Sequence, residues 1–208
     1  ERSRGLGDVY KRQEISGTGC RAMKRAFDMT FALCAGLLLL LPIGVVALCV
    51  RWTSDGPVLY WSDRVGRDNR LFRMPKFRSM RLDTPAVATH LLSDPDKYLT
   101  PVGSFLRKSS LDELPQLWSI LKGDMSLVGP RPALFNQTDL IQARTHAGVH
   151  RLLPGLTGWA QINGRDELPI AQKVRLDAEY LDRHSFGFDL KILLLTAWRV
   201  LRRDGVTH

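Results

Sequence analysis

One long apolar segment constrains this chain more than any other feature of its sequence. Residues 26–50 read AFDMTFALCAGLLLLLPIGVVALCV, and Asp28 is the single charged residue among them. A straight helix of this length would measure about 36 Å, which is enough to cross the hydrocarbon core of a bilayer. The segment therefore predicts contact with a membrane.

Two features predict that this segment turns back instead of crossing. Pro42 lies inside it, and proline removes a backbone hydrogen bond and bends a helix. Basic residues flank both ends: Arg21, Lys24 and Arg25 before it, and Arg51, Arg64 and Arg67 after it. Because positively charged flanks stay on the cytoplasmic side, we expect a helix that is broken near Pro42 and that enters and leaves by one face. An ordinary spanning anchor remains the alternative. A cleaved signal peptide is disfavoured because no small-residue cleavage pattern follows the run.

The chain is strongly basic, which points to an acidic partner. Its 208 residues carry a net charge of +9 and a pI near 9.9. Such a balance suits anionic lipid, a phosphorylated substrate or nucleic acid. The apolar segment and the scattered basic residues disfavour nucleic acid. Cys20, Cys34 and Cys49 have no metal-type spacing, and we expect reduced thiols.

Two adjacent carboxylates lie in residues 106–132, which read LRKSSLDELPQLWSILKGDMSLVGPRP. Asp112 and Glu113 precede a short apolar helix pattern, which we expect to begin near Leu114 or Pro115. At a helix N-terminus the dipole would favour their ionised form. An ionised carboxylate among arginines can attack phosphorus or hold a metal ion on a phosphate. Taken alone, the pair is more simply interpreted as acids that begin a helix.

Other segments offer groups that suit phosphate. Arg131 lies between two prolines, which restrict its backbone. Lys76 and Arg78 alternate along an expected strand, so both side chains would share one face, although such a face is usually just solvated. Residues 154–165, PGLTGWAQINGR, contain three glycines that would permit close backbone approach to a ligand, and Trp159 could stack or simply pack.

The remaining pattern predicts a small α+β domain. We expect short strands within residues 57–80, a surface loop over 83–103, and helices over 134–149, 171–183 and 185–203. In the last helix the apolar face is Leu190, Leu193, Leu194, Ala197 and Leu201, opposite Lys191, Arg199 and Arg202. This pattern suits a membrane surface and a core-packing helix equally well. The expected organisation is a disordered or non-native tail (1–20), a re-entrant membrane helix (21–54) and a catalytic domain (55–208).

An ordered set of segments resembles a known family. They are KRAFD, RVG, PKFRSM, SLDELPQLWSILKGDMSLVGPRP, PGLTGWAQINGR and FDLKILLLTAWRVLRRDGV, running from Lys24 to about His208. The chain thereby resembles the bacterial sugar transferase family, whose single-domain members are monotopic, membrane-bound polyprenol phosphate phosphoglycosyl transferases. The resemblance implies a mixed helix and strand catalytic domain with an N-terminal re-entrant helix broken near Pro42 and interfacial amphipathic helices.

The resemblance also implies an activity and a set of site residues. The enzyme would transfer a sugar-1-phosphate from a UDP-sugar to a polyprenol phosphate such as undecaprenyl phosphate, releasing UMP through a covalent aspartyl intermediate. This would be the first membrane step of bacterial glycan assembly (exopolysaccharide, O-antigen or glycoprotein), on the cytoplasmic face of the inner membrane. Asp112 and Glu113 would be catalytic, with Mg²⁺ at Asp112. The implied substrate- and phosphate-binding residues are Lys76, Arg78, Arg107, Arg131, Arg165 and Asp177.

Several points stay open at this stage. Ser62 and Pro75 stand where many relatives carry Gln and Tyr, so the sugar is undecided, as is the oligomeric state. A non-enzymatic scaffold docked on anionic lipid would also explain the charge and the apolar segments. It would not explain an Asp-Glu pair beside an arginine held between prolines.

Overall fold

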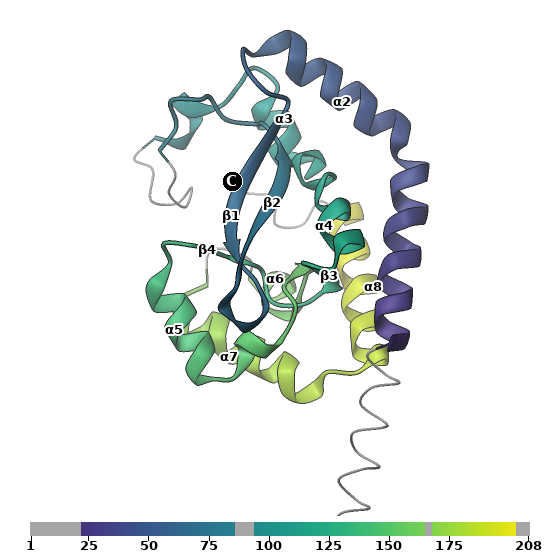
Figure 1. Ribbon diagram of the computed structural model, residues 1–208, viewed down its shortest axis with the longest axis vertical. Coiled ribbons are helices and arrows are strands. Elements are labelled where there is room, and N and C mark those ends of the chain that lie inside the picture. The colour runs from purple at the N-terminus through teal and green to yellow at the C-terminus, as the bar shows by residue number, and fades with distance from the viewer. Residues whose placement is uncertain (1–21, 86–93, 165–167, 203–208) are drawn as a thin grey trace, which may run out of the picture.

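Two consecutive helices form the apolar segment in the computed structural model, which describes residues 22–85, 94–164 and 168–202 (Figure 1). The N-terminal helix, Ala22–Leu38, and α2, Leu40–Thr53, are bent by 63° at a one-residue break. Within the described residues, neither helix is by itself long and apolar enough to cross a membrane. The bent pair together meets that criterion by length and composition alone.

Pro42 explains the position of the bend. It is the third residue of α2, and a proline ring clashes with the carbonyl group four residues earlier. That carbonyl belongs to Leu38, the last residue of the N-terminal helix. Regular backbone hydrogen bonds flank the break, from Leu39 N to Ala35 O (2.9 Å) and from Ile43 N to Leu39 O (2.8 Å). The break predicted near Pro42 is therefore observed, three residues before the proline itself.

A β-hairpin forms the centre of the larger sheet, whose strand order is β2-β1-β4. Strands β1 (Leu59–Val65) and β2 (Leu71–Phe77) are antiparallel and are joined through a 3₁₀ turn, Arg67–Asn69. The register runs from Leu59 opposite Phe77 to Val65 opposite Leu71. The short strand β4 (Ala133–Leu134) pairs with the end of β1. Since β2 lies at the edge, Pro75 can occupy it without breaking an internal ladder.

A second, two-stranded sheet pairs β3 (Ser126–Val128) with β5 (Gly155–Thr157) in parallel. The other elements are η3 Pro95–Tyr98, α3 Gly103–Lys108, η4 Leu111–Glu113, α4 Gln116–Lys122, α5 Thr138–His146, η5 Val149–Arg151, α6 Trp159–Ile162, α7 Ile170–Arg183 and α8 Phe186–Arg202. The mixture of helices and small sheets agrees with the α+β prediction. The helix expected over 134–149 begins later, because the preceding residues pair with β1 and then turn.

Two hydrophobic clusters connect the bent helices to the rest of the chain. The larger one contains Ala32 of the N-terminal helix together with residues of β3, α4, α7 and α8. The smaller one packs Val46 and Val50 of α2 against Phe77 and Leu106. In Figure 1 the N-terminal helix, drawn in purple, runs beside α8, and α2 continues toward α3. The predicted domain boundary at residue 54 stays a prediction, since packing extends across it.

Helix α8 buries only part of the predicted apolar face: Leu193 packs against the larger cluster. Phe188 and Ile192 are buried in the larger cluster. Leu190 and Leu194, from the predicted apolar stripe, are 44% and 64% exposed, and the neighbouring Trp198 is 53% exposed. Thus part of the stripe is a free apolar surface beside basic residues, and core packing does not account for it.

Candidate active site

The two adjacent carboxylates lie in a 3₁₀ turn, η4, just before α4. Ser110 precedes this turn with a left-handed backbone (φ 56°), and its side chain makes no capping hydrogen bond. Pro115 is the N-terminal cap of α4, within a residue of the predicted start. Gly123 ends α4 as predicted, with φ 101°. Asp112 and Glu113 are therefore fixed by a tight turn that packs against β2.

Glu113 is held by two cations from separate parts of the chain. Lys76 Nζ, from β2, donates to Glu113 Oε1 at 2.8 Å, and Arg131 Nη2 donates to the same oxygen at 3.3 Å. Burial would raise the pKa of the Glu113 carboxyl, but the charges and hydrogen bonds of Lys76 and Arg131 outweigh it and hold the pKa well below its usual range. Glu113 is consequently ionised at any physiological pH.

Asp112 has the opposite environment, although it is the adjacent residue. It is 7% exposed, and in the described part of the chain no group hydrogen-bonds its carboxylate. Burial raises its pKa, and the Glu113 charge adds to this, while Lys76, Arg107 and Arg131 pull in the other direction. At Asp112 the loss of hydration therefore outweighs the nearby positive charges, and the pKa values of the two adjacent acids shift in opposite directions.

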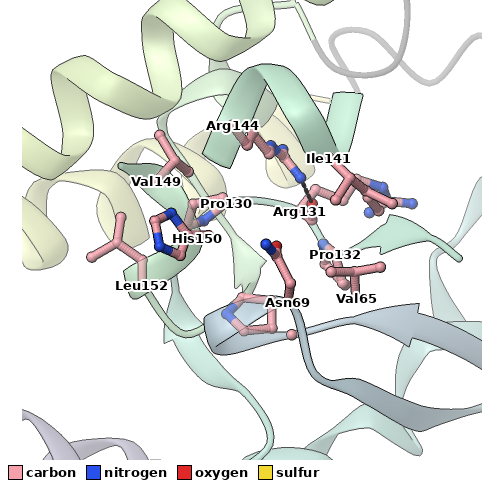
Figure 2. Close-up of a pocket in the computed structure, with 13 residues that line it drawn as sticks. Val65, Asn69, Pro130, Arg131, Pro132, Ile141, Arg144, Val149, His150 and Leu152 are labelled. Atoms are coloured by element: carbon pink, nitrogen blue, oxygen red, sulfur yellow. Dashed lines mark hydrogen bonds between the residues drawn. The ribbon is translucent and has the colours of Figure 1, made fainter. Parts of the chain in front are cut away.

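Pro130, Arg131 and Pro132 form a loop, here called the Pro-Arg-Pro loop, that is supported by a buried ion pair. Arg144 of α5 donates to Asp177 Oδ2 of α7 through Nε (2.9 Å) and Nη2 (2.7 Å). Its Nη1 donates to the Arg131 carbonyl at 2.7 Å (Figure 2). Burial raises the pKa of Asp177, against the effect of Arg144. Asp177, predicted to bind substrate, therefore acts in this structure through Arg144 and the backbone of Arg131.

A small cavity lies behind the same loop (Figure 2). Its lining includes Asn69, Pro130, Pro132, His150 and Leu152, and its volume is about 30 Å³. A space of this size accommodates about two water molecules. The cavity is thus part of the packing beneath the loop and has no room for a nucleotide.

Three glycines let the backbone of this region pack closely. A Cβ atom on Gly129 would lie 2.3 Å from the Leu153 carbonyl oxygen. One on Gly155 would lie 2.1 Å from Gly129 N, and one on Gly158 would lie 2.1 Å from Gly129 O. Of the three glycines predicted to admit a ligand, Gly155 and Gly158 therefore admit the backbone of Gly129, next to the Pro-Arg-Pro loop, whereas Gly164 faces the side chain of Leu168.

The remaining predicted site residues are Arg107, Arg78 and Arg165, and the first two differ in their contacts. Arg107 is close enough to lower the pKa of Asp112, and its Nη1 contacts Met80 Sδ at 3.7 Å. Arg78 is 3% exposed and donates to the carbonyl and hydroxyl oxygens of Ser54 at the end of α2 (3.0 and 2.9 Å), so it and Lys76 reach different partners. Arg165 lies outside the described residues.

Sequence reasoning missed Arg144, which supports the loop. Its partner Asp177 is 33 positions away, and a lone arginine in a helix pattern gives no signal of such a contact. Arg144 is buried although most of α5 is polar, and this burial is known only from the fold.

Among the described residues, no three His, Cys, Asp or Glu side chains lie close enough together to hold a metal ion. Asp112 nevertheless offers a carboxylate to which none of these residues donates a hydrogen bond, whereas Glu113 is engaged by two cations. A cation that takes one protein carboxylate and further oxygens from a phosphorylated substrate would fit this arrangement.

Comparison with known proteins places these features among sugar transferases. The family model described as bacterial sugar transferase matches residues 19–203. The uncharacterized sugar transferase EpsL of Bacillus subtilis is 43% identical over 188 residues, covering 88% of this chain and 90% of that protein.

Two larger relatives have more specific names. The undecaprenyl-phosphate glucose phosphotransferase of Komagataeibacter xylinus is 43% identical over 85% of this chain. The UDP-glucose:undecaprenyl-phosphate glucose-1-phosphate transferase of Escherichia coli is 39% identical over 89% of this chain. The chain spans 35% and 41% of the length of these two proteins.

Proposed function

Because the chain belongs to the bacterial sugar transferase family, we propose that it transfers a sugar-1-phosphate from a UDP-sugar to a polyprenol phosphate, releasing UMP. One observation carries the proposal. Asp112 is buried without a hydrogen-bond donor from the described residues, directly beside an ionised Glu113 and three basic groups. A carboxylate left in this state is available to a phosphorus atom.

The reaction proceeds by two displacements at one phosphorus. A carboxylate oxygen of Asp112 attacks the β-phosphorus of the UDP-sugar, and the bond to the bridging oxygen breaks, so UMP leaves with that oxygen. An oxygen of the polyprenol phosphate then attacks the same phosphorus. The aspartyl bond breaks, and the Asp112 carboxylate is regenerated with a diphosphate-linked sugar on the lipid.

The basic residues stabilise the charge that develops during both steps. Arg107 and Arg131 border the carboxylates, and the family resemblance adds Arg165. Guanidinium groups bind phosphate through two parallel hydrogen bonds, which suits a diphosphate that gains charge in the transition state. Glu113, kept ionised by Lys76 and Arg131, holds these two cations in place and through them orients the incoming polyprenol phosphate.

Mg²⁺ is the metal that the family resemblance implies, and Asp112 would hold it. The donor set fits, because Mg²⁺ commonly binds one or two carboxylates together with substrate phosphates and water. Bound there, the ion would neutralise part of the charge on the diphosphate.

The proposal includes a position on the cytoplasmic face of the bacterial inner membrane, since a polyprenol phosphate stays in the bilayer. The bent helix pair would enter and leave one leaflet. In its support, the side chains around the bend are highly exposed and apolar, including Leu37 (66%), Leu38 (81%) and Leu41 (78%). The exposed stripe on α8, with Trp198 beside Arg199 and Arg202, suits the membrane interface.

The test is a transfer assay with the full chain in detergent or lipid vesicles. Undecaprenyl phosphate, Mg²⁺ and either UDP-glucose or UDP-galactose should yield UMP and a sugar-labelled lipid. Without the lipid acceptor, label from the UDP-sugar should remain on the protein and be lost in an Asp112→Asn variant. Binding to anionic vesicles without UMP release from any UDP-sugar would support the scaffold alternative instead.

A further inference from the structure

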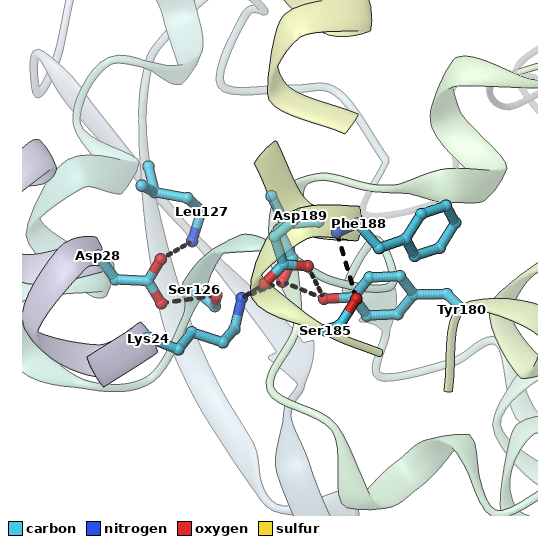
Figure 3. Close-up of polar contacts among 9 residues, drawn as sticks. Lys24, Asp28, Ser126, Leu127, Tyr180, Ser185, Phe188 and Asp189 are labelled. Carbon is cyan, nitrogen blue, oxygen red and sulfur yellow. Dashed lines mark hydrogen bonds and ion pairs between the residues drawn. The ribbon is translucent and has the colours of Figure 1, made fainter. Parts of the chain in front are cut away.

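The polar side of the N-terminal helix is bound into the centre of the protein rather than facing solvent. Lys24 donates to Asp189 of α8 and, at 3.4 Å, to the Val128 carbonyl (Figure 3). Tyr180 of α7 donates to the same two groups, at 2.6 Å to Asp189 and 3.2 Å to Val128. Asp28 is 2% exposed. We call these residues, with their β3 partners Ser126 and Leu127, the helix seam.

Asp28 completes the contact with β3. Its carboxylate accepts a hydrogen bond from Ser126 Oγ at 2.7 Å and from the Leu127 amide at 3.3 Å (Figure 3). Together with Lys24 on Val128, the helix therefore contacts polar groups of three successive residues of one short strand. A strand of three residues has little stability of its own, so these contacts fix its position.

Arg25 of the same helix reaches the end of α4. Its Nη1 donates to the Ile120 carbonyl at 2.6 Å and its Nη2 to the Leu121 carbonyl at 2.9 Å. A cation is favourable there, because the last carbonyl groups of a helix carry partial negative charge. The N-terminal helix thus contacts both the helix that follows Asp112 and the strand that precedes the Pro-Arg-Pro loop.

The chain segment between β3 and the candidate site is short and restricted. Three residues lie between Ser126–Val128 and Pro132, and two of them are Pro130 and Arg131. The Gly129 amide donates to Thr157 O at 2.9 Å, and this backbone is closely packed, since a Cβ atom on Gly129 would lie 2.3 Å from Leu153 O. A displacement of Val128 would accordingly be transmitted to the Arg131 guanidinium, which lies 3.3 Å from Glu113.

We propose that Asp28 and Lys24 are positioning residues for the transferase reaction: by fixing β3, they set the placement of Arg131 against Glu113. This inference rests on the proposed function. It makes the membrane helix part of the active-site support as well as an anchor, so that seating of the helix in the bilayer and alignment of the catalytic groups are coupled.

The experiment compares Asp28→Ala and Asp28→Asn with Arg131→Ala in the full-length protein, using UDP-glucose or UDP-galactose with undecaprenyl phosphate. For Asp28→Ala we expect kcat to fall about tenfold to hundredfold, the range that displaced catalytic groups produce. Asp28→Asn keeps an acceptor for the Leu127 amide and should restore most of kcat.

Two further measurements separate positioning from loss of stability. Ile192→Ala, in the larger hydrophobic cluster, should lower the melting temperature without the loss of kcat expected for Asp28→Ala, and the exposed variant Asp83→Ala should change neither quantity. The Asp28→Ala and Arg131→Ala pair should be no slower than Arg131→Ala alone, since both act on one group. Hydrogen exchange at the Leu127 and Gly129 amides should accelerate in Asp28→Ala.

The outcomes are distinct. An Asp28→Ala enzyme with the wild-type kcat, or with an effect that multiplies that of Arg131→Ala, would overturn the inference while the proposed function stands. A wild-type protein that transfers no phosphosugar would overturn the proposed function itself.

Discussion

Two charge clusters contact the segment from β3 to Pro132, and their carboxylates differ in the hydrogen bonds that they accept. In the helix seam, Asp28 accepts from a hydroxyl and an amide, and Asp189 accepts from Lys24 and Tyr180. In the candidate site, Glu113 likewise accepts from two groups, Lys76 and Arg131. Asp112, at its side, receives no hydrogen bond from the described residues.

This difference separates support from chemistry. Buried polar groups in folded proteins are almost always paired, because leaving one unpaired costs free energy. A closed cluster such as the helix seam therefore contributes to the fold. A buried carboxylate that stays without a donor lowers the stability of the fold and is retained where a substrate supplies the missing partner.

The largest expected effect comes from removing the unpartnered charge. Asp112→Asn should reduce transfer to background, because an amide cannot attack phosphorus. The melting temperature should stay equal or rise, since the variant no longer buries an unpaired charge. UMP release and thermal unfolding monitored by circular dichroism measure the two quantities. Near-normal turnover would refute the covalent scheme, and a large loss of stability would mean that Asp112 belongs to the supporting network.

The matching change in the helix seam should have the opposite signature. Asp189→Asn leaves the Lys24 ammonium group buried without its counter-ion, which should lower the free energy of unfolding by about 3 kcal/mol. Asp83→Asn, in the exposed pair with Arg81, is the control and should cost less than about 1 kcal/mol. Urea unfolding in detergent measures both. Equal effects from the two variants would remove the distinction between closed and exposed pairs.

Arg131 connects the two clusters, and a conservative change tests its geometry. Arg131→Lys keeps the charge but loses the planar fork that binds phosphate through two hydrogen bonds. We expect kcat/KM to fall roughly tenfold, equivalent to about 1.4 kcal/mol of transition-state stabilisation. Lys122→Arg, on the exposed end of α4, is a charge-conserving control that should leave kinetics unchanged. Unaltered kinetics for Arg131→Lys would leave Arg131 a structural role alone.

The two neighbouring acids should also give opposite pH dependence of stability, with smaller amplitude. The pKa of Glu113 lies below its usual 4.5, so its ionised form adds stability that is present above that pH and is lost as the pH falls below it. The pKa of Asp112 lies above its usual 3.8, so its contribution falls as the pH rises above 3.8. Melting temperatures between about pH 3 and 7 for Glu113→Gln and Asp112→Asn should therefore diverge from wild type with opposite slopes. Parallel curves would contradict the difference between the acids.

Local chemistry made much of this fold predictable from sequence. Pro42 prevents a helical hydrogen bond to the carbonyl group four residues before it, and Gly123 takes a left-handed backbone that ends α4. The two strands of the hairpin follow from their own short sequence patterns. Each of these effects operates within a few residues of the chain. The Asp112-Glu113 pair and Arg131 were identifiable for the same reason, since an acid pair and an arginine between prolines are visible as short patterns.

Long-range pairing was not predictable. Asp28 and Ser126 are 98 positions apart, and Lys24 and Asp189 are 165 apart, so no local pattern links them. The buried face of α8 was predicted only in part, because its sequence carries apolar residues on more than one side and tertiary packing selects between them. The glycines after Pro154 were assigned to a ligand because sequence shows where backbones can approach closely but not what approaches them.

The helix seam and the bend both restrain the topology of the N-terminal helix. Removing the bend alone should change the topology little, and a second change in the helix seam should enlarge the effect. Pro42→Leu removes the cause of the bend and should favour one continuous spanning helix. The N-terminal flank would then have to cross the bilayer, yet Lys24 and Asp28 are bound to α8 and β3. Crossing requires those buried contacts to break, against the preference of basic flanks for the cytoplasm.

Pro42→Leu alone should therefore leave most molecules re-entrant, and Pro42→Leu with Asp189→Ala should shift many more toward spanning. Single cysteines placed before Lys24 and after Arg51, in a background lacking the native cysteines, report the topology through an impermeant thiol reagent. In intact cells both sites should be protected in the wild type and become reactive once the cells are opened. Labelling before Lys24 in intact wild-type cells would refute the re-entrant arrangement. If the double variant labels no more than Pro42→Leu, the helix seam does not restrain the N-terminal helix, and the flanking charges and the bend set its topology without it.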